Sequence, residues 1–170
     1  PEAHAAYLQG LYLWNRRNAP GLRKAITLFE EAVRRDPTYA QAYGGMAMAY
    51  TVLPAYDDVG NADMLNRARD AAGRALALDS ANVQALTSLA YVEALHYRNT
   101  SSENLFRRAI AADSSFGTAH FWYGLLLLQQ ERNEEALAAI LRARALEPAS
   151  LVINTAVTQV LYDMRRYDAA

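Results

Sequence analysis

The sequence predicts an all-α solenoid, a superhelix of helix-turn-helix hairpins that stack one on the next. Its composition favours helices, because alanine fills 34 of the 170 positions and glycine and proline are few, and alanine and leucine lose little on entering a helix. Four segments also share an apolar residue, an alanine three residues later, and an acidic residue before a closing proline or serine. These closing residues are spaced by 43, 34 and 34 residues; they are Pro37, Ser80, Ser114 and Pro148. A repeat of this length is typical of solenoids.

The period divides the chain into successive helical hairpins within one domain, residues 1–170. The predicted repeats are 3–37, 38–80, 81–114, 115–148 and an incomplete fifth, 149–170. The predicted helices, two in each complete repeat and one in the fifth, are 2–17, 20–35, 39–53, 62–78, 83–97, 101–112, 117–130, 134–146 and 150–164.

Polar residues at the predicted helix starts suggest how these helices are capped. Thr38 and Thr100 each precede a Gln or Glu by three residues, which is the capping-box pattern. Asn133 is placed to cap the eighth helix, and Asn61 or Asp63 to cap the fourth, because these side chains accept hydrogen bonds from free backbone N–H groups.

The four complete repeats share one arrangement of small and large residues. In the first two it is interrupted between the helices, by three extra residues around "NRRNAPG" and by nine in "TVLPAYDDVGNAD". The third and fourth have no gap, although Glu93 occupies an aromatic position in the third. Small residues on each first helix allow the second helix to approach closely; they are Gly10, Ala47, Ala90 and Gly124. This pattern resembles the tetratricopeptide repeat (TPR).

The TPR resemblance covers nearly the whole chain and implies a right-handed superhelical solenoid. Each hairpin of such an array buries its apolar stripe only by stacking on a neighbour. The ending "MRRYDAA" fits as a turn and the start of another helix, with Tyr167 at the aromatic position and Ala170 at the first small position. We therefore expect the chain to be part of a longer array.

The first repeat, "AYLQGLYLWNRRNAPGLRKAITLFEEAVRRDPTYAQAYGGMAMAY", is similar to TPR arrays that follow effector domains in bacterial multidomain regulators. Those effectors are winged-helix DNA-binding domains, nucleotide cyclases and protein kinases. The resemblance implies the sensory or partner-binding arm of a larger cytoplasmic regulator, and it transfers no catalytic residue to this chain.

Composition and motifs argue against several other functions. The net charge of −1 removes the electrostatic case for a nucleic-acid or anionic-membrane surface, and no apolar run approaches the ~20 residues of a membrane span. The three histidines lie far apart and there is no cysteine. The loop "YDDVGNAD" lacks the spacing of a calcium-binding loop. We therefore expect no enzyme activity, no metal and no cofactor.

In a TPR array, fixed positions of each first helix face the concave side, and here they hold no charged residue. The predicted partner-binding groove consists of Tyr7, Leu11, Trp14, Met48, Gln84, Tyr91, Phe121, Trp122 and Leu125. The carboxylate clamp of chaperone-binding TPR domains is not expected, because its basic positions hold Tyr7, Leu11, Gly45, Gln84 and Ser88. The sequence thus predicts a scaffold that binds an apolar or helical segment of a protein or peptide. That segment could belong to a separate protein or to another domain of the same chain.

Self-association is the alternative function. The fifth repeat would lack its second helix, which would leave an apolar stacking face formed by Leu151, Val157 and Leu161. Copies of the chain could then associate through this face or through the groove.

Overall fold

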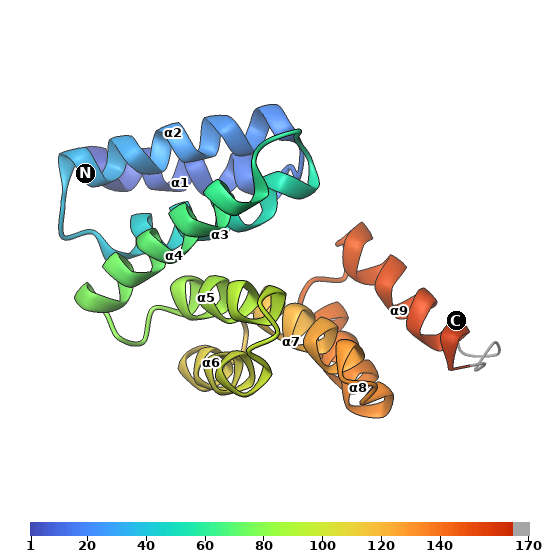
Figure 1. Ribbon diagram of the computed structural model, residues 1–170. Helices are drawn as coiled ribbons and strands as arrows, with labels where there is room; N and C mark the ends of the chain where they lie inside the picture. Colours follow the sequence, from blue (N-terminus) through green and yellow to red (C-terminus); the bar gives the residue numbers. More distant parts are fainter. Residues whose placement is uncertain (165–170) are drawn as a thin grey trace.

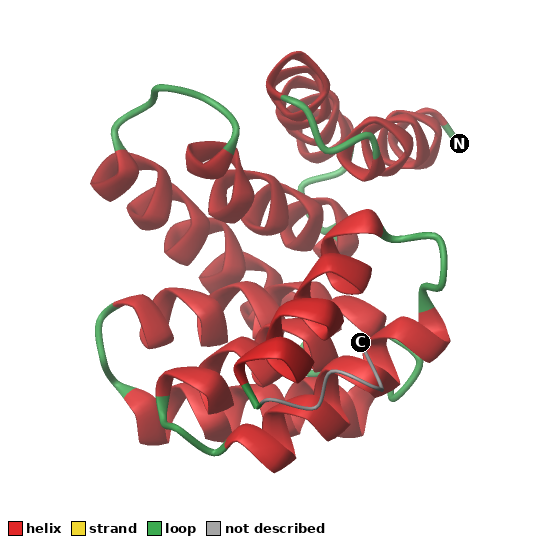
Figure 2. Cartoon of the chain, turned by 90° about the vertical axis from the view of Figure 1, so that its right-hand side faces the viewer, coloured by secondary structure: helices red, strands yellow, loops and turns green. Residues whose placement is uncertain are grey.

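The computed structural model describes residues 1–164, and its regular elements in this part are all helical (Figures 1 and 2). They are α1 (Glu2–Asn15), α2 (Ala19–Arg35), α3 (Ala40–Val52), the short 3₁₀ helix η1 (Leu53–Ala55), α4 (Asn61–Leu78), α5 (Val83–Leu95), α6 (Asn99–Ala112), α7 (Gly117–Gln129), α8 (Asn133–Leu146) and α9 (Leu151–Asp163). Every predicted helix is present, with its ends within two residues of the predicted ones. The positions expected for Tyr167 and Ala170 lie outside the described residues.

Consecutive helices pair into stacked hairpins. Helix α1 pairs with α2, α3 with α4, α5 with α6 and α7 with α8, while α9 packs against α8. The first helices of neighbouring hairpins also contact one another, α1 with α3, α3 with α5 and α5 with α7. The hairpins follow a curved path from α1 to α9 (Figure 1), which is the predicted solenoid. None of the helices in residues 1–164 is long and apolar enough to span a bilayer.

The small residues of the first helices make room for large residues of the second helices. Phe29 of α2 is fully buried, and a Cβ atom added at Gly10 of α1 or at Gly45 of α3 would lie 2.5 or 2.7 Å from its ring. Likewise, a Cβ atom added at Gly124 of α7 would lie 2.5 Å from the side chain of Ile140 of α8. The predicted close approach is therefore present, and Phe29 fills the space between two successive hairpins.

Polar contacts reinforce the stacking where one repeat meets the next. The Tyr50 hydroxyl on α3 donates to Glu30 Oε1 on α2, at 3.1 Å. The Tyr123 hydroxyl on α7 donates to Glu103 Oε1 on α6, at 2.9 Å, and Arg132 donates to the other oxygen of Glu103 at 2.9 Å. Each of these carboxylates thus joins the second helix of one hairpin to the next hairpin.

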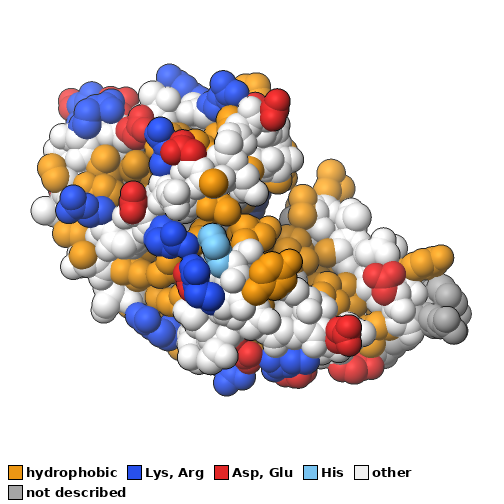
Figure 3. Space-filling model, viewed as in Figure 1, with side chains coloured by type: hydrophobic (Ala, Val, Ile, Leu, Met, Phe, Trp, Pro, Cys, Tyr) orange, Lys and Arg blue, Asp and Glu red, His pale blue; other side chains and the backbone are white. Residues whose placement is uncertain are grey.

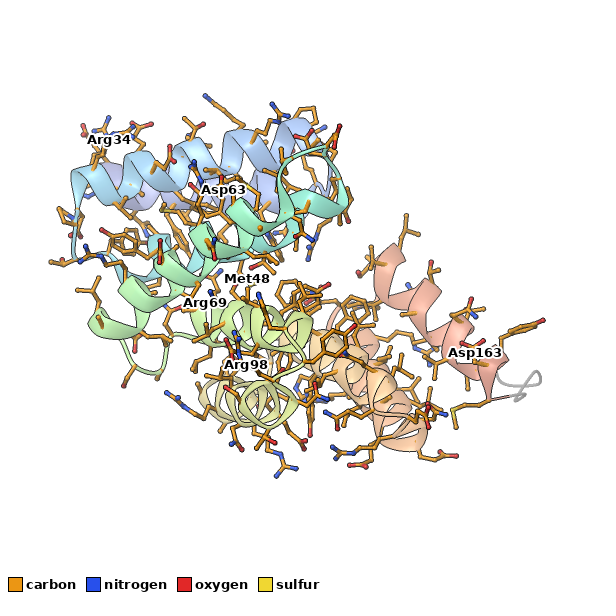
Figure 4. The ribbon with its side chains drawn as sticks, viewed as in Figure 1. Arg34, Met48, Asp63, Arg69, Arg98 and Asp163 are labelled. Atoms are coloured by element: carbon orange, nitrogen blue, oxygen red, sulfur yellow. The ribbon has the colours of Figure 1, made fainter. Side chains whose placement is uncertain are left out.

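Glu93, the residue that departs from the repeat pattern, is held by two arginines. Arg98 at the start of α6 donates to its carboxylate, and Arg69 of α4 lies 4.0 Å from it; both arginines are labelled in Figure 4. The hydrogen bond from Arg98 is the main reason why the pKa of Glu93 lies below its usual value. An ion pair therefore replaces the expected aromatic contact.

The predicted helix caps are wrong. Helices α3, α4, α6 and α8 begin without a side-chain cap. Thr38 instead donates its hydroxyl to Asp36 at 2.7 Å, and Thr100 and Asn133 lie inside their helices. The side-chain caps that form are Asn18, which accepts from Gly21 N at 2.8 Å, and Asn82, which accepts from Ala85 N at 3.0 Å.

The long link between α3 and α4 is fastened by its acidic residues. Asp57 accepts a hydrogen bond from Arg23 of α2. Asp63, labelled in Figure 4, pairs with Arg67 one turn later, at 3.0 Å. Neither Asp63 nor Asn61 caps α4, because this helix begins after Gly60 and has no side-chain cap.

The predicted C-terminal stacking face is wrong for two of its three residues. Val157 and Leu161 are only 2% and 4% exposed and belong to the main hydrophobic core, because α9 packs against α8 of the fourth repeat. Leu151 is 82% exposed.

Two glycines allow a test of the packing. Gly45→Ala would force the added methyl against the ring of the fully buried Phe29, and overpacking of this kind costs ~1–3 kcal/mol. The better helix propensity of alanine returns at most ~1 kcal/mol. We expect a net loss of up to about 2 kcal/mol in the free energy of unfolding, measured by urea denaturation.

Gly73→Ala is the matched control, because Gly73 lies within α4 and the added Cβ has no heavy atom within 4 Å apart from its chain neighbours and its own helix backbone. It should raise the free energy of unfolding by ~0.5–1 kcal/mol. If both substitutions raise the free energy of unfolding, or both lower it, this description of the core is contradicted.

The Glu93 ion pair predicts a specific response to acid. Because the pKa of Glu93 is lower in the folded state, its stabilising effect is present above the unfolded pKa of ~4.3 and is lost as pH falls through the folded value. The stability difference between wild type and Glu93→Gln should therefore be largest near neutral pH and shrink below about pH 4.5. Denaturation between about pH 7 and about pH 3 measures this.

Glu131 provides the control for that experiment because it is exposed. Glu131→Gln should change the free energy of unfolding by no more than ~0.5 kcal/mol, as is usual for surface substitutions. A Glu93 difference that does not change with pH would show that its ion pair does not stabilise the fold.

Candidate functional site

The inner side of the solenoid contains an apolar cleft of about 210 Å³. It lies among η1, the middle of α5 and α7, and the beginning of α9. Hydrophobic side chains are visible on the surface between the α1–α4 part and α9 (Figure 3). The larger apolar and aromatic side chains that line the cleft are Val52, Tyr56, Tyr91, Phe121, Trp122, Leu125, Val152 and Ile153.

Four of the nine predicted groove residues lie together in this cleft, namely Tyr91, Phe121, Trp122 and Leu125. The rings of Tyr91 and Trp122 contact each other, with their centroids 4.7 Å apart and their planes at 42°. Trp122 and Phe121 are 5% and 9% exposed, so each contributes both to the core and to the wall of the cleft. Burial raises the pKa of the Tyr91 hydroxyl.

Two more predicted residues, Tyr7 and Gln84, line a separate hollow of about 350 Å³ near the turns between repeats. The Tyr7 hydroxyl donates to Gln84 Oε1 at 3.4 Å, and the Tyr7 ring packs edge-on against Tyr39, with centroids 5.2 Å apart. Burial is the main reason why the pKa of Tyr7 rises to about 12. The structure therefore divides the predicted groove into two parts.

Of the remaining three predicted residues, two are buried in the packed interior and one is half-buried. Met48 is 1% exposed and lies between α3 and α5 (Figure 4), so a partner has no surface of this residue to contact. Leu11 is half-buried against the core. Trp14 is 7% exposed, and its ring supports the side chain of Arg17.

The cleft also contains charged residues, which could not be predicted from the concave positions of the first helices. Arg17 and Glu147 both line it, and both come from turns. Arg17 lies between α1 and α2, with a positive φ of 50°. Tyr97 and Glu131, in the corresponding turns of the third and fourth repeats, have φ of 57° and 59°. The expectation of an uncharged concave face is therefore wrong.

Arg17 is half-buried, and its guanidinium carbon lies 3.7 Å from the centroid of the Trp14 ring. Burial lowers its pKa from the ordinary value, while Tyr56 and Glu147 act in the opposite direction. An arginine remains protonated at neutral pH even so. The cleft therefore contains one fixed positive charge on an aromatic support.

Glu147 departs from the repeat pattern. At the corresponding position of the earlier repeats, Asp36, Asp79 and Asp113 each accept a hydrogen bond from the backbone N–H two residues later, at 2.9, 3.0 and 2.9 Å. Glutamate is one methylene longer, and the Glu147 carboxylate instead accepts from the Thr118 hydroxyl at 3.5 Å. The sequence carried a signal for this residue, because it is the one glutamate in a series of aspartates.

The cleft continues into a second, more open hollow of about 590 Å³. The two share five residues, namely Arg17, Tyr56, Glu147, Ser150 and Val152. Arg17 and Glu147 therefore lie at the junction of the two spaces, and the cleft extends past them.

Comparison with known proteins gives relatives of low sequence identity. No protein-family model matches the chain. It is 25% identical over 142 residues to the transcriptional regulator HilA of Salmonella typhimurium, over 84% of this chain and 26% of that protein. It is 28% identical over 158 residues to superkiller protein 3 of Schizosaccharomyces pombe, over 86% of this chain and 10% of that protein. The chain thus spans about a quarter or less of the length of these curated relatives.

Similar solved structures cover nearly the whole chain. PilF of Pseudomonas aeruginosa has a TM-score of 0.68 at 19% identity, over 99% of this chain and 71% of that one. A thermophilic TPR protein of Thermus thermophilus has a TM-score of 0.65 at 18% identity, over 94% of this chain and 99% of that one. MamA of Desulfovibrio magneticus has a TM-score of 0.58 at 15% identity, over 98% of this chain and 88% of that one. The repeat pattern, the stacked hairpins and these likenesses agree, and the chain has the fold of a tetratricopeptide-repeat protein.

Proposed function

We propose that this chain is a non-catalytic interaction module whose cleft binds an apolar or helical segment of a protein partner. The observation that carries this proposal is the aromatic wall of the cleft, where the rings of Tyr91 and Trp122 contact each other and Phe121 also lines the space. Aromatic side chains in pockets are frequent anchors of protein interfaces. A helix with an apolar face is a suitable occupant for such a surface.

We place this module in a larger bacterial regulator. The likeness to the transcriptional regulator HilA covers 84% of this chain but 26% of that protein, which suits one arm of a multidomain protein. In this arrangement the effector domain and its activity belong to other parts of the protein, and the TPR array supplies contacts.

Self-association, the alternative function, has less apolar surface to support it. Of the three residues predicted to form a stacking face, Leu151 alone is exposed. Sedimentation velocity over a concentration series separates the two functions. A dimer that Leu151→Gln dissociates would favour self-association over the binding of a separate partner.

Val152 is a suitable residue for testing the cleft. Trp122→Ala is a poor choice, because this side chain is 5% exposed and truncating a buried tryptophan costs ~3–5 kcal/mol of stability. Val152 lines the cleft and is 46% exposed. We expect Val152→Gln to weaken binding of a peptide selected on the wild-type chain about tenfold, because an amide replaces an apolar contact. Random peptides of about 12 residues, long enough for three helical turns, provide the ligands by phage display, and fluorescence anisotropy measures affinity.

Leu78→Gln is the matched control. Leu78 is the last residue of α4, is also 46% exposed, and is not among the residues that line the cleft. It should leave affinity unchanged. Equal effects of the two substitutions, or no effect of either, would place the binding surface elsewhere and overturn the proposal.

A further inference from the structure

The guanidinium of Arg17 has unused donors in the cleft. Within residues 1–164 its side chain makes no hydrogen bond or ion pair, and its close contact is the face of the Trp14 ring. Within residues 1–164, seven of the other thirteen arginines pair with carboxylates, as Arg35 does with Glu31 at 2.8 Å. Arg17 is half-buried and faces the space that a bound segment would fill.

Trp14 holds this charge in place. The guanidinium carbon lies over the indole, 3.7 Å from the ring centroid, and stacking of arginine on an aromatic face is favourable. Trp14 is itself buried at 7% exposure, so the support is rigid. A charge that is already positioned loses less conformational entropy when it binds an anion.

Glu147 does not neutralise Arg17. Its carboxylate accepts from Thr118 and contacts the backbone at Gly117, where an added Cβ would collide with it. It attracts Arg17 through space but forms no ion pair with it in the described part of the chain. The donors of Arg17 therefore stay available, although the charge of Glu147 opposes a second anion nearby.

The size of the cleft defines the rest of the ligand. A cavity of ~150 Å³ accommodates benzene, so the 210 Å³ of the cleft holds one large apolar side chain against the Tyr91–Trp122 wall. Because Arg17 lies where the cleft opens into the second hollow, the bound chain can continue past it. This position suits an acidic side chain inside a segment better than a terminal carboxylate.

We propose that Arg17 recognises an aspartate or glutamate side chain of the bound segment, beside an apolar side chain that fills the cleft. This inference rests on the proposed function and adds the chemistry of the partner. It differs from a carboxylate clamp on the first helices, because the positions of that clamp hold Tyr7, Leu11, Gly45, Gln84 and Ser88.

Peptide selection provides the first test. Peptides selected on the wild-type chain, and then synthesised with amidated C-termini, should share a large apolar residue and an acidic residue within one helical turn of it. Selection on Arg17→Met, which keeps an unbranched apolar stem, should retain the apolar residue and lose the acidic one. Selected peptides without a shared acidic residue would overturn the inference.

A double-mutant cycle provides the second test. Replacing the acidic residue of a selected peptide by its amide should weaken binding to the wild-type chain about tenfold or more, because a hydrogen bond between charged groups is lost. The same replacement should not weaken binding to Arg17→Met, and it should strengthen this binding slightly because the repulsion from Glu147 remains. If the ratio of the affinities for the acidic and amide peptides is the same in Arg17→Met as in the wild type, Arg17 does not contact the acidic side chain.

Glu147→Gln gives an independent measurement of opposite sign. Removing its charge should strengthen binding of the acidic peptide a few-fold and leave the amide peptide unchanged. The controls at Val152 and Leu78 separate the two proposals. If Val152→Gln weakens binding but the acid and amide peptides bind equally, the Arg17 inference fails and the proposed function stands. If no peptide binds at the cleft, the proposed function itself fails.

Discussion

The insertion of Phe29 between Gly10 and Gly45 is the contact on which the first half of the fold depends. The Phe29 side chain of α2 contacts α1 in its own hairpin and α3 in the next hairpin. Neither helix has space for a Cβ atom at the contact. The ring therefore sets the spacing within a hairpin and between hairpins at the same time. Each repeat buries its apolar face only against its neighbour, so contacts of this kind hold successive hairpins together, and the stacked hairpins follow a curved path (Figure 1).

The curvature in turn brings distant turns together. Arg17 belongs to the first hairpin and Glu147 to the fourth, yet both line one cleft. Neither comes from the concave faces of the first helices, which supply the aromatic wall. In this array the helices provide the apolar part of the cleft and the turns provide its charge. The stacking of the hairpins between them therefore sets the distance between these two charges.

The helices and their hairpin pairing could be predicted from sequence because the same pattern recurs in four repeats. Each repeat has a small residue on its first helix, and the later repeats follow a 34-residue period. The caps could not be predicted, because Thr38 and Asp36 compete within one turn. The aspartate binds the threonine N–H and hydroxyl, and local side-chain hydrogen bonds of this kind are an alternative to capping. A capping-box pattern shows that a suitable capping residue is present. It does not show whether that residue caps the helix or forms a hydrogen bond with a neighbouring side chain.

The candidate site could be predicted in part for a related reason. Fixed positions on each first helix predict a groove only if every repeat is an ideal unit, and Tyr91, Phe121, Trp122 and Leu125 were predicted correctly on this basis. The prediction failed for Met48, because Gly44 and Gly45 bring neighbouring helices so close to α3 that this side chain is enclosed at 1% exposure. It also failed for Val157 and Leu161, whose burial depends on how α9 packs against α8 of the fourth repeat.

The turns show where departures from a repeat carry information. Three aspartates at equivalent positions bind their own turns and need no further explanation. Glu147 keeps the backbone hydrogen bond of that turn, from Ser150 N at 3.1 Å, but its longer side chain leaves the turn and reaches the cleft. The fold therefore does not require glutamate there, since aspartate builds the same turn three times. Glu147 instead connects this turn to the start of α7, through Thr118 and beside Gly117. It also adds a negative charge beside Arg17, which opposes a second anion there.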